Sequence, residues 1–582
     1  MEGGVLLEGW CRLFLDGLAA AGATELVVSP GSRSTPIVLA GRADPRFSLE
    51  LVVDERAASF YALGRARVTG RPPVLVRTSG SAGGHDLPAV IEALEAGLPL
   101  VIVTADRPRE LLGVRSPQTT DQTHLFGTRA VGFFELGRPV ESEVALRSAR
   151  RVGASAAALA LGPRPGAVQV NLPADKPLEP GPDRGPDELA FMARVEAILA
   201  EPPPRTYGSQ RLPSAEGLDA LVEAFSSARR PLVVAGPSRP LTAEGRARVL
   251  SALERLGAPV VAEATSQLRL GPGGLGGVGL GAAVGVADLS SELAPDLVLQ
   301  LGDPPVSTGL QRALARWGGR RMAVVTEGYP DPLSRAEVIH GGWAETLEPL
   351  AERVRGGFPE FSAAWRGAEQ IAKGAVEATL ALEGGWNEGV ATKIARDAVP
   401  AGGRLMVGNS LAVRHLDTLV PPGGEPCEVL HQRGASGIDG LIAGAVGAAK
   451  AQPLLLILGD VSARHDLGGM ALGPRVGEAL TVLVLHNGGG RIFEQLPIAK
   501  NPASEASVLD PFVAPDATSL VPVARALGWW AREVRDPAAL EAALRAPTDG
   551  RPRWVEARVS AHGARESADF LAREIAARVS IP

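Results

Sequence analysis

Two stretches of the sequence decide the fold, LLLILGD at residues 454–460 and TVLVLHNGGG at residues 481–490. Each begins with a short apolar run and ends in polar, turn-forming residues, which is typical of a buried strand in a parallel sheet. The gap between Asp460 and Asn487 suits one crossover helix between neighbouring parallel strands. Because the carboxyl ends of parallel strands meet at one edge of a sheet, we expect both side chains at the same edge.

Asp460 and Asn487 carry oxygen atoms of the kind that Mg²⁺ prefers. A carboxylate, an amide oxygen and a nearby backbone carbonyl form a hard site, which the ion usually completes with phosphate oxygens and water. The glycines after Asn487 let the backbone approach an anion closely, and a helix N-terminus after the turn favours negative charge. The pair therefore predicts a metal–diphosphate site. The alternative is that Asp460 caps a helix and Asn487 occupies a turn.

Apolar runs alternate with helical patterns along the whole chain, which predicts an α/β fold with parallel sheets covered on both faces. A breaker-rich stretch at 201–213 indicates a linker, and we expect Gly271–Gly285 to be a loop. Three α/β domains are predicted, at 1–185, 186–375 and 376–582. The remaining predicted strands are Leu26–Val28, Val74–Val76, Leu100–Val103, Leu232–Ala235, Val260–Ala262, Leu297–Leu301, Ala323–Val325, Leu405–Val407 and Trp554–Val559.

The composition is that of an ordinary globular protein, with 45% hydrophobic and 21% charged residues among 582. The formal charge of −6 argues against a nucleic-acid surface, where a basic patch is expected. Cys11 and Cys427 stand far apart, which excludes a disulfide framework and favours a reducing cytoplasm. We expect no signal peptide and no membrane span, because the N-terminus has no basic region and apolar runs are interrupted.

The first and last thirds of the chain carry six further motifs. They are SPGSRSTP at 29–36, DERAA at 54–58, TADRP at 104–108, GNSL at 408–411, RGASGIDG at 433–440 and IFEQLP at 492–497. These motifs resemble those of thiamine-diphosphate enzymes. The narrower resemblance is to the 2-succinyl-5-enolpyruvyl-6-hydroxy-3-cyclohexene-1-carboxylate synthase family of the menaquinone pathway. The motifs occur in the family order, and the middle third is covered weakly.

The resemblance implies three α/β domains that bind thiamine diphosphate with Mg²⁺ or Mn²⁺. It implies a homodimer or homotetramer with active sites between subunits. It further implies that the chain decarboxylates 2-oxoglutarate and adds the resulting enamine to isochorismate, a transferase reaction of menaquinone biosynthesis. The alternatives are another thiamine-diphosphate 2-oxo-acid decarboxylase, an acetohydroxyacid-synthase-like carboligase, or a relative that binds the cofactor without catalysis.

The resemblance also assigns roles to single residues. Glu55 would promote the reactive tautomer of the cofactor's pyrimidine ring, and Ile438 would bend the cofactor so that its two rings meet. Arginines would bind the anionic substrates, because their planar fork meets carboxylates through two hydrogen bonds. The cofactor-binding set is Glu55, Gly80, Ser410, Ser436, Ile438, Gly459 and Ser462. The substrate-binding set is Ser32, Arg33, Arg107, Gln118, Arg414, Arg433, Ile492, Phe493 and Leu496. The metal ligands would be Asp460, Asn487 and the carbonyl of Gly489.

Besides Gly488, which replaces an Asn or Asp, three positions depart from the family pattern. His85 stands where an Asn usually ends a Ser-Gly-Thr-Ala run, and His486 replaces a common Asn beside the metal Asn. Thr308 stands where a Lys is frequent, so a basic substrate contact is lost or supplied by Arg312. These changes leave the cofactor residues in place and bear on the choice of substrate.

Overall fold

Three parallel sheets, each flanked by helices, make up the part of the chain that the structure describes. The structure is a computed structural model and describes residues 3–207, 211–285, 293–354, 356–500 and 506–579. All strand pairs within these ranges are parallel, which confirms the predicted fold class. The chain divides into two units. One holds Met1–Ser209, Gln432–Ala451 and Asp466–Arg475, and the other holds Gln210–His431, Gln452–His465 and Val476–Pro582.

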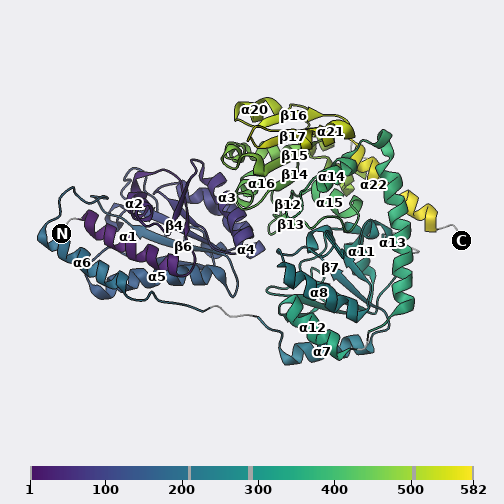
Figure 1. The fold of residues 1–582 in the computed structure, drawn as a ribbon, viewed down its shortest axis with the longest axis horizontal. Helices are drawn as coiled ribbons and strands as arrows, with labels where there is room; N and C mark the ends of the chain where they lie inside the picture. Colours follow the sequence, from purple (N-terminus) through teal and green to yellow (C-terminus); the bar gives the residue numbers. More distant parts are fainter. Residues whose placement is uncertain (1–2, 208–210, 286–292, 355, 501–505, 580–582) are drawn as a thin grey trace. The chain divides into compact units, whose positions relative to one another are not determined.

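The first sheet belongs to the first unit and has the strand order β2-β1-β3-β4-β6-β5. Figure 1 shows helices α1 (Gly3–Ala20) and α5 (Glu143–Leu161) side by side. They approach so closely that a Cβ on Gly17 would lie 1.9 Å from the Arg150 carbonyl oxygen. The strands are β1 (Glu25–Val28), β2 (Ser48–Leu51), β3 (Val74–Arg77), β4 (Leu100–Asp106), β5 (Gly132–Glu135) and β6 (Ala167–Pro173). The other helices are α2 (Thr35–Ala43), α3 (Glu55–Thr69), α4 (Leu87–Ala96) and α6 (Pro186–Ala200), with short 3-10 turns η1 (Ser32–Ser34), η2 (Ala82–Asp86), η3 (Arg109–Leu111) and η4 (Gly127–Arg129).

The second sheet has the order β11-β10-β9-β7-β8. Its strands are β7 (Pro231–Ala235), β8 (Val260–Ala262), β9 (Leu297–Leu301), β10 (Arg320–Val325) and β11 (Glu337–His340). Its helices are α7 (Ala215–Ser227), α8 (Ala243–Leu256), α9 (Leu280–Ala283), α11 (Thr308–Arg316), α12 (Trp343–Arg353) and α13 (Pro359–Leu380). The short helix α9 lies inside Gly271–Gly285, so the prediction of a loop throughout that stretch was wrong. Leu280 and Ala283 are buried in the core, which explains why the chain turns helical there.

The third sheet has the order β13-β12-β14-β15-β17-β16 and carries the two stretches quoted first. Its strands are β12 (Arg404–Val407), β13 (Glu428–His431), β14 (Leu454–Gly459), β15 (Leu480–His486), β16 (Trp530–Val534) and β17 (Arg553–Arg558). Helices of the same unit are α14 (Glu388–Asp397), α15 (Leu411–Leu419), α17 (Asp460–His465), α19 (Ala506–Val513), α20 (Val521–Ala526), α21 (Pro537–Arg545) and α22 (Gly563–Val579). Helix α22 runs beside α13 (Figure 1).

The connection between β14 and β15 differs from the prediction. One crossover helix was expected, but the described residues 460–479 form two short helices, α17 and α18 (Leu467–Met470), followed by two 3-10 turns. Gly468 and Gly469 lie within α18, and Gly473 and Pro474 lie within the first 3-10 turn. Residues of such low helix propensity do not sustain one long helix. The connection still returns the chain to a parallel neighbour, with Leu454 opposite Leu480 and Gly459 opposite Leu485.

Helix α16 (Leu441–Ala449) and α18 belong to the first unit and pack with α3. A Cβ on Gly64 of α3 would lie 2.0 Å from the carbonyl oxygen of Gly444, so this crossing requires small residues. Within the described residues, no helix has both the length and the apolar character needed to cross a membrane. The three predicted domain boundaries stay a prediction.

Candidate active site

Asp460 and Asn487 lie at the same edge of the third sheet, as predicted. Asp460 directly follows β14, and Asn487 directly follows the adjacent parallel strand β15. The Asp460 carboxylate is buried, and its Oδ2 accepts a hydrogen bond of 2.8 Å from the backbone N–H of Gly489. Its Oδ1 accepts from the N–H of Val461 at 2.9 Å. The turn after β15 is thus held directly against the end of β14.

Burial raises the pKa of Asp460 above its ordinary value, because desolvation disfavours the charged carboxylate. The nearby His486, with Nδ1 3.6 Å from Oδ2, and the two backbone N–H groups act in the opposite direction. A bound divalent cation would act in the same direction as His486 and favour the charged form.

Asn487 supplies the clearest sign that a ligand binds at this edge. Its Nδ2 donates a hydrogen bond of 2.7 Å to Oε1 of Glu388, so the amide nitrogen is satisfied. Its Oδ1 is buried and has no hydrogen-bond partner among the described residues. A buried, unpartnered amide oxygen is costly unless another group binds it. Because the neighbouring strand end carries the Asp460 carboxylate, this donor set fits a hard divalent cation.

Gly489, the third predicted ligand, has a backbone conformation that favours glycine, with φ of +135°. A Cβ at this position would lie 2.5 Å from the carbonyl oxygen of Val513. Its carbonyl oxygen accepts a hydrogen bond of 2.9 Å from the N–H of Arg491 and has a second lone pair for a cation. Among the described residues no cluster of three or more His, Cys, Asp and Glu side chains is suited to a metal. The predicted ligand set has one carboxylate, one amide oxygen and one backbone carbonyl, so it differs from a cluster of His, Cys, Asp and Glu side chains.

Ser410 begins helix α15 in a strained conformation, with φ of +66° and ψ of −127°. Strain of this kind in a residue other than glycine is concentrated at functional sites. The Arg414 guanidinium donates to the Ser410 carbonyl oxygen at 2.7 Å and steadies the turn. Gly459 is the last residue of β14, and Ser462 is buried in α17, the helix that Asp460 begins. These four predicted residues therefore belong to the same unit as the candidate metal ligands.

The predicted substrate residues Ile492, Phe493 and Leu496 lie on the 3-10 turn η9 (Arg491–Gln495) and the residue after it. Ile492 and Phe493 are half-buried, and Leu496 is 41% exposed. The Phe493 ring packs against Phe512 with 5.7 Å between ring centroids. Because the turn follows Asn487 within a few residues, these side chains also belong to the unit of the metal ligands.

Glu55 is the first residue of α3 in the first unit and is half-buried. The neighbouring Asp54 caps the helix by accepting from the N–H groups of Arg56 and Ala57, so Glu55 is not needed as a cap. The Glu55 carbonyl oxygen accepts from Arg77 at 3.4 Å, and Arg77 forms a fully buried ion pair with Asp86. Burial raises the pKa of Asp86 to about 6. A buried charge pair therefore fixes the backbone that carries Glu55.

Arg33 and Arg107 are brought together in the first unit. Arg33 is buried in η1, and its Nη1 donates to the Ala174 carbonyl oxygen at 2.6 Å. Burial lowers the pKa of Arg33, and the positive charge of Arg107 lowers it further. The Nε atoms of both arginines are buried without a hydrogen-bond partner among the described residues. Two like charges with unused donors are suited to bind an anion. Ser32, in the same turn η1, is exposed.

Gln118, a predicted substrate residue, lies against Gly80, a predicted cofactor residue. The Gln118 Nε2 donates to the Ser79 carbonyl oxygen at 3.2 Å. A Cβ on Gly80, whose φ is +95°, would lie 3.0 Å from Cγ of Gln118. The backbone of Gln118 also has a positive φ, of +54°.

The loop that carries Arg433, Ser436 and Ile438 is anchored to α4 of the same unit. The buried Glu92 carboxylate accepts from the N–H groups of Gly434 and Ala435, at 3.0 and 2.7 Å. Burial raises the pKa of Glu92. Arg433 and Ile438 are half-buried, and Ser436 is exposed.

The predicted residues therefore fall into two sets, one in each unit. The first unit holds Ser32, Arg33, Glu55, Gly80, Arg107, Gln118, Arg433, Ser436 and Ile438. The second unit holds Ser410, Arg414, Gly459, Asp460, Ser462, Asn487, Gly489, Ile492, Phe493 and Leu496. The sequence analysis missed the supporting carboxylates Asp86, Glu92 and Glu388, since no local pattern shows that a carboxylate is buried. Glu92 and Glu388 also lie 342 and 99 positions from the partners named here, Gly434 and Asn487.

The three departures from the family pattern lie in different settings. His85 is exposed on η2. His486 is buried between the carboxylates of Asp460 and Glu556, with nitrogen–oxygen distances of 3.6 and 3.7 Å. Thr308 begins α11, where the preceding backbone N–H groups of Val306 and Ser307 donate to the buried Glu263.

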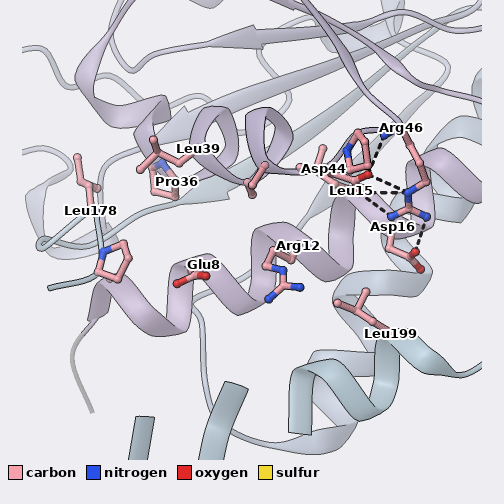
Figure 2. Close-up of a pocket in the computed structure, with 15 residues that line it drawn as sticks. Glu8, Arg12, Leu15, Asp16, Pro36, Leu39, Asp44, Arg46, Leu178 and Leu199 are labelled. Carbon is pink, nitrogen blue, oxygen red and sulfur yellow. Dashed lines mark hydrogen bonds and ion pairs between the residues drawn. The ribbon is translucent and has the colours of Figure 1, made fainter. Parts of the chain in front are cut away.

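A cavity of about 620 Å³ lies elsewhere in the first unit, between α1, α2 and α6. Figure 2 shows the apolar Leu15, Leu39 and Leu199 among its lining residues, together with charged side chains. One of these, Arg46, is bound to Asp44 and Asp16. None of the predicted site residues lines this cavity.

The parallel α/β sheets and a match to a protein family identify the class as thiamine-diphosphate enzymes. The family described as "Thiamine pyrophosphate enzyme, N-terminal TPP binding domain" matches residues 11–125. This stretch includes Glu55, Gly80 and Arg107, and it confirms the thiamine-diphosphate cofactor.

Similar proteins narrow the assignment. Proteins named "2-succinyl-5-enolpyruvyl-6-hydroxy-3-cyclohexene-1-carboxylate synthase" are similar to this chain over most of their length. The one from Sorangium cellulosum is 42% identical, covering 87% of this chain and 85% of its own. The one from Geobacillus kaustophilus is 40% identical, covering 85% of this chain and 85% of its own. The one from Myxococcus xanthus is 36% identical, covering 94% of this chain and 94% of its own. The chain belongs to this synthase family and is a thiamine-diphosphate-dependent enzyme of the transferase type.

Proposed function

We propose that the chain decarboxylates 2-oxoglutarate and joins the remaining four-carbon unit to isochorismate. The product would be 2-succinyl-5-enolpyruvyl-6-hydroxy-3-cyclohexene-1-carboxylate, the compound that the relatives' name specifies. The observation that carries this proposal is the buried, unpartnered Oδ1 of Asn487 on the strand end next to Asp460. It supports a divalent cation, Mg²⁺ or Mn²⁺, held by Asp460, Asn487 and the carbonyl of Gly489, where a diphosphate would bind.

Thiamine diphosphate, when bound, supplies a nucleophilic carbon and accepts the electron pair that the loss of CO₂ releases. Glu55 would hold a proton at the pyrimidine N1′ atom, and Ile438 would keep the two rings of the cofactor close together. Ser410 and Ser462 would contact the diphosphate. The fully buried Arg77–Asp86 pair supports this role of Glu55, because it restrains the backbone of that residue.

Both proposed substrates are anions, so cationic side chains would bind and orient them. Arg33 and Arg107 have unused buried donors, and Arg414 and Arg433 match family positions. Ser32 and Gln118 would add hydrogen bonds. The side chains of Ile492, Phe493 and Leu496 would exclude water from the reacting atoms. These assignments rest on the resemblance and on the grouping of the residues within each unit.

We also propose a homodimer or homotetramer in the cytoplasm, with active sites between subunits. Leu51 and Val53, which lead into Glu55, are 55% and 74% exposed, and exposed apolar side chains are suited to a subunit interface. Both cysteines are free thiols, as in a reducing compartment.

A two-substrate assay tests the proposed function. The purified chain with thiamine diphosphate and Mg²⁺ is incubated with 2-oxoglutarate and isochorismate, and mass spectrometry follows the adduct and CO₂. The proposal requires the adduct, and requires it only when both substrates are present. Ready turnover of pyruvate without any adduct would favour an acetohydroxyacid-synthase-like carboligase or a decarboxylase. Cofactor binding without CO₂ release would indicate a non-catalytic relative.

A further inference from the structure

A buried carboxylate lies behind the candidate metal site and takes no part in the predicted chemistry. Glu388, the first residue of α14, is 3% exposed. One oxygen, Oε1, accepts the hydrogen bond of 2.7 Å from Nδ2 of Asn487. The other, Oε2, is hydrogen-bonded to Nε2 of His415 on α15. Glu388 therefore joins two helices to the turn that carries the candidate ligand.

The chemistry of the two groups decides which way the amide of Asn487 points. An ionised carboxylate only accepts hydrogen bonds, whereas an amide has one accepting end and one donating end. Asn487 must therefore turn its nitrogen toward Glu388, and its oxygen must face the opposite way. That oxygen is the buried atom without a hydrogen-bond partner among the described residues. We propose that Glu388 is a positioning residue that fixes the Asn487 amide with its oxygen toward the cation.

A purely structural role does not account for this arrangement. Asn387 already caps α14 by accepting from the N–H of Val390 at 3.1 Å, so Glu388 is not needed for the start of the helix. A glutamate in the first turn of a helix is usually solvated there and gains from the helix dipole. Burying the carboxylate instead carries a desolvation penalty that its hydrogen-bond partners must offset. The cost is explained if the carboxylate sets the orientation of Asn487.

His415 keeps the carboxylate in place. Because Oε2 is occupied by the imidazole, Glu388 cannot rotate to another partner without breaking a buried hydrogen bond. Outer groups of this kind hold metal ligands in other proteins, and their loss typically weakens metal binding about 10–100-fold.

The inference rests on the metal site in the proposed function, and a binding measurement separates the two. Binding of thiamine diphosphate to the full chain is followed by intrinsic tryptophan fluorescence while Mg²⁺ is titrated. The concentration of Mg²⁺ at half-saturation is compared for wild type, Glu388→Gln and the control Glu263→Gln. Glu263 is also a buried carboxylate of the second unit that accepts two backbone N–H groups, but it lies beside the second sheet.

A reversed pair gives the sharpest comparison. In Glu388→Gln the new amide no longer dictates which end of Asn487 faces it. Adding Asn487→Asp restores a fixed arrangement, because the glutamine amide then donates to the new carboxylate and an oxygen still faces the cation. In the single variant Asn487→Asp, two carboxylates face each other and repel. The four chains form a double-mutant cycle that measures the coupling between the two positions.

We expect Glu388→Gln to raise the half-saturating Mg²⁺ concentration about tenfold or more, and the reversed pair to regain most of that loss. Glu263→Gln is expected to stay near wild type. One outcome would overturn the positioning role alone. In it, wild type binds the cofactor only with Mg²⁺, but Glu388→Gln has the same half-saturating Mg²⁺ concentration as the control. The positioning role would also be overturned if the reversed pair needed as much Mg²⁺ for half-saturation as the weaker of the two single variants. Wild type that binds the cofactor without regard to Mg²⁺ would overturn the metal site, and the positioning role with it.

Discussion

The backbone N–H of Gly489 donates to Oδ2 of Asp460 over 2.8 Å, which ties the turn after β15 to the end of β14. The protein's own hydrogen bond therefore holds the two strand ends together. A cation that uses Asp460, Asn487 and the Gly489 carbonyl meets a largely formed site, which lowers the cost of ordering the ligands.

Replacing Asp460 by Ala is expected to abolish Mg²⁺-dependent binding of thiamine diphosphate, because it removes the one charged ligand of the site. Isothermal titration with and without Mg²⁺ measures this. Asp536→Ala is the control, since Asp536 caps α21 by accepting from Ala539 and its loss costs about 1 kcal/mol of stability. An Asp460→Ala chain that still binds the cofactor only when Mg²⁺ is present would refute the assignment.

Glu55→Gln is expected to bind the cofactor and to lose turnover by roughly 100–10,000-fold, the usual contribution of a positioned acid or base. The variant keeps the size of the side chain and the cap on α3, which Asp54 provides. Turnover and cofactor affinity are measured separately for this chain and for Glu25→Gln, a carboxylate of the same unit that pairs with Arg65. Unchanged turnover in Glu55→Gln would remove Glu55 from the mechanism.

Arg107→Gln is expected to raise KM for the anionic substrates about tenfold or more, because it removes a charge-assisted hydrogen bond. Arg109→Gln is the matched control, since Arg109 lies two positions further along the same loop and is exposed. Steady-state kinetics give kcat and KM for each chain. If both variants shift KM equally, general electrostatics rather than a specific contact explains the effect.

Asp466 makes stability depend on pH. Burial raises its pKa from 3.8 to about 6, while the N–H groups of Ile442, Ala443 and Gly469 oppose the shift. A carboxyl whose pKa is raised on folding adds stability that is complete below pH 3.8 and is lost as the pH rises through about 6. The difference in melting temperature, wild type minus Asp466→Asn, should therefore be larger at about pH 5 than at about pH 8.

Asp44→Asn provides the contrast for that measurement. Hydrogen bonding to Arg46 lowers the pKa of Asp44, so this group stays ionised in both the folded and the unfolded chain across the same range. The difference in melting temperature between wild type and Asp44→Asn should stay constant from about pH 5 to about pH 8. If the difference in melting temperature between wild type and Asp466→Asn is equally constant, Asp466 keeps an ordinary pKa.

Apart from β6, the interior strands of the three sheets were predictable from the sequence, and most of the edge strands were not. β14 and β15 are continuous apolar runs because both faces are covered. Edge strands such as β2 (SLEL) and β16 (WAREV) carry charges and are partly exposed, so no apolar run marks them. β6 is interior, yet Gln169 and Asn171 interrupt its apolar pattern with buried hydrogen bonds, and it too was missed.

The candidate site was predictable where a short motif marks it, and its support was not. Asp460 and Asn487 follow recognisable strands, so their shared edge could be inferred. Glu388 lies far from Asn487 along the chain, at the start of an ordinary amphipathic helix. Only the folded chain shows that its carboxylate turns inward to the amide of Asn487.

The most direct measurement is the position of Mn²⁺ in a crystal of the chain grown with thiamine diphosphate and Mn²⁺, located by its anomalous scattering. The account predicts one ion bound at about 2.0–2.3 Å by an Asp460 carboxylate oxygen, Oδ1 of Asn487 and the Gly489 carbonyl, with the diphosphate completing the shell. An ion bound elsewhere, or a diphosphate held without contact to Asp460 and Asn487, would contradict it.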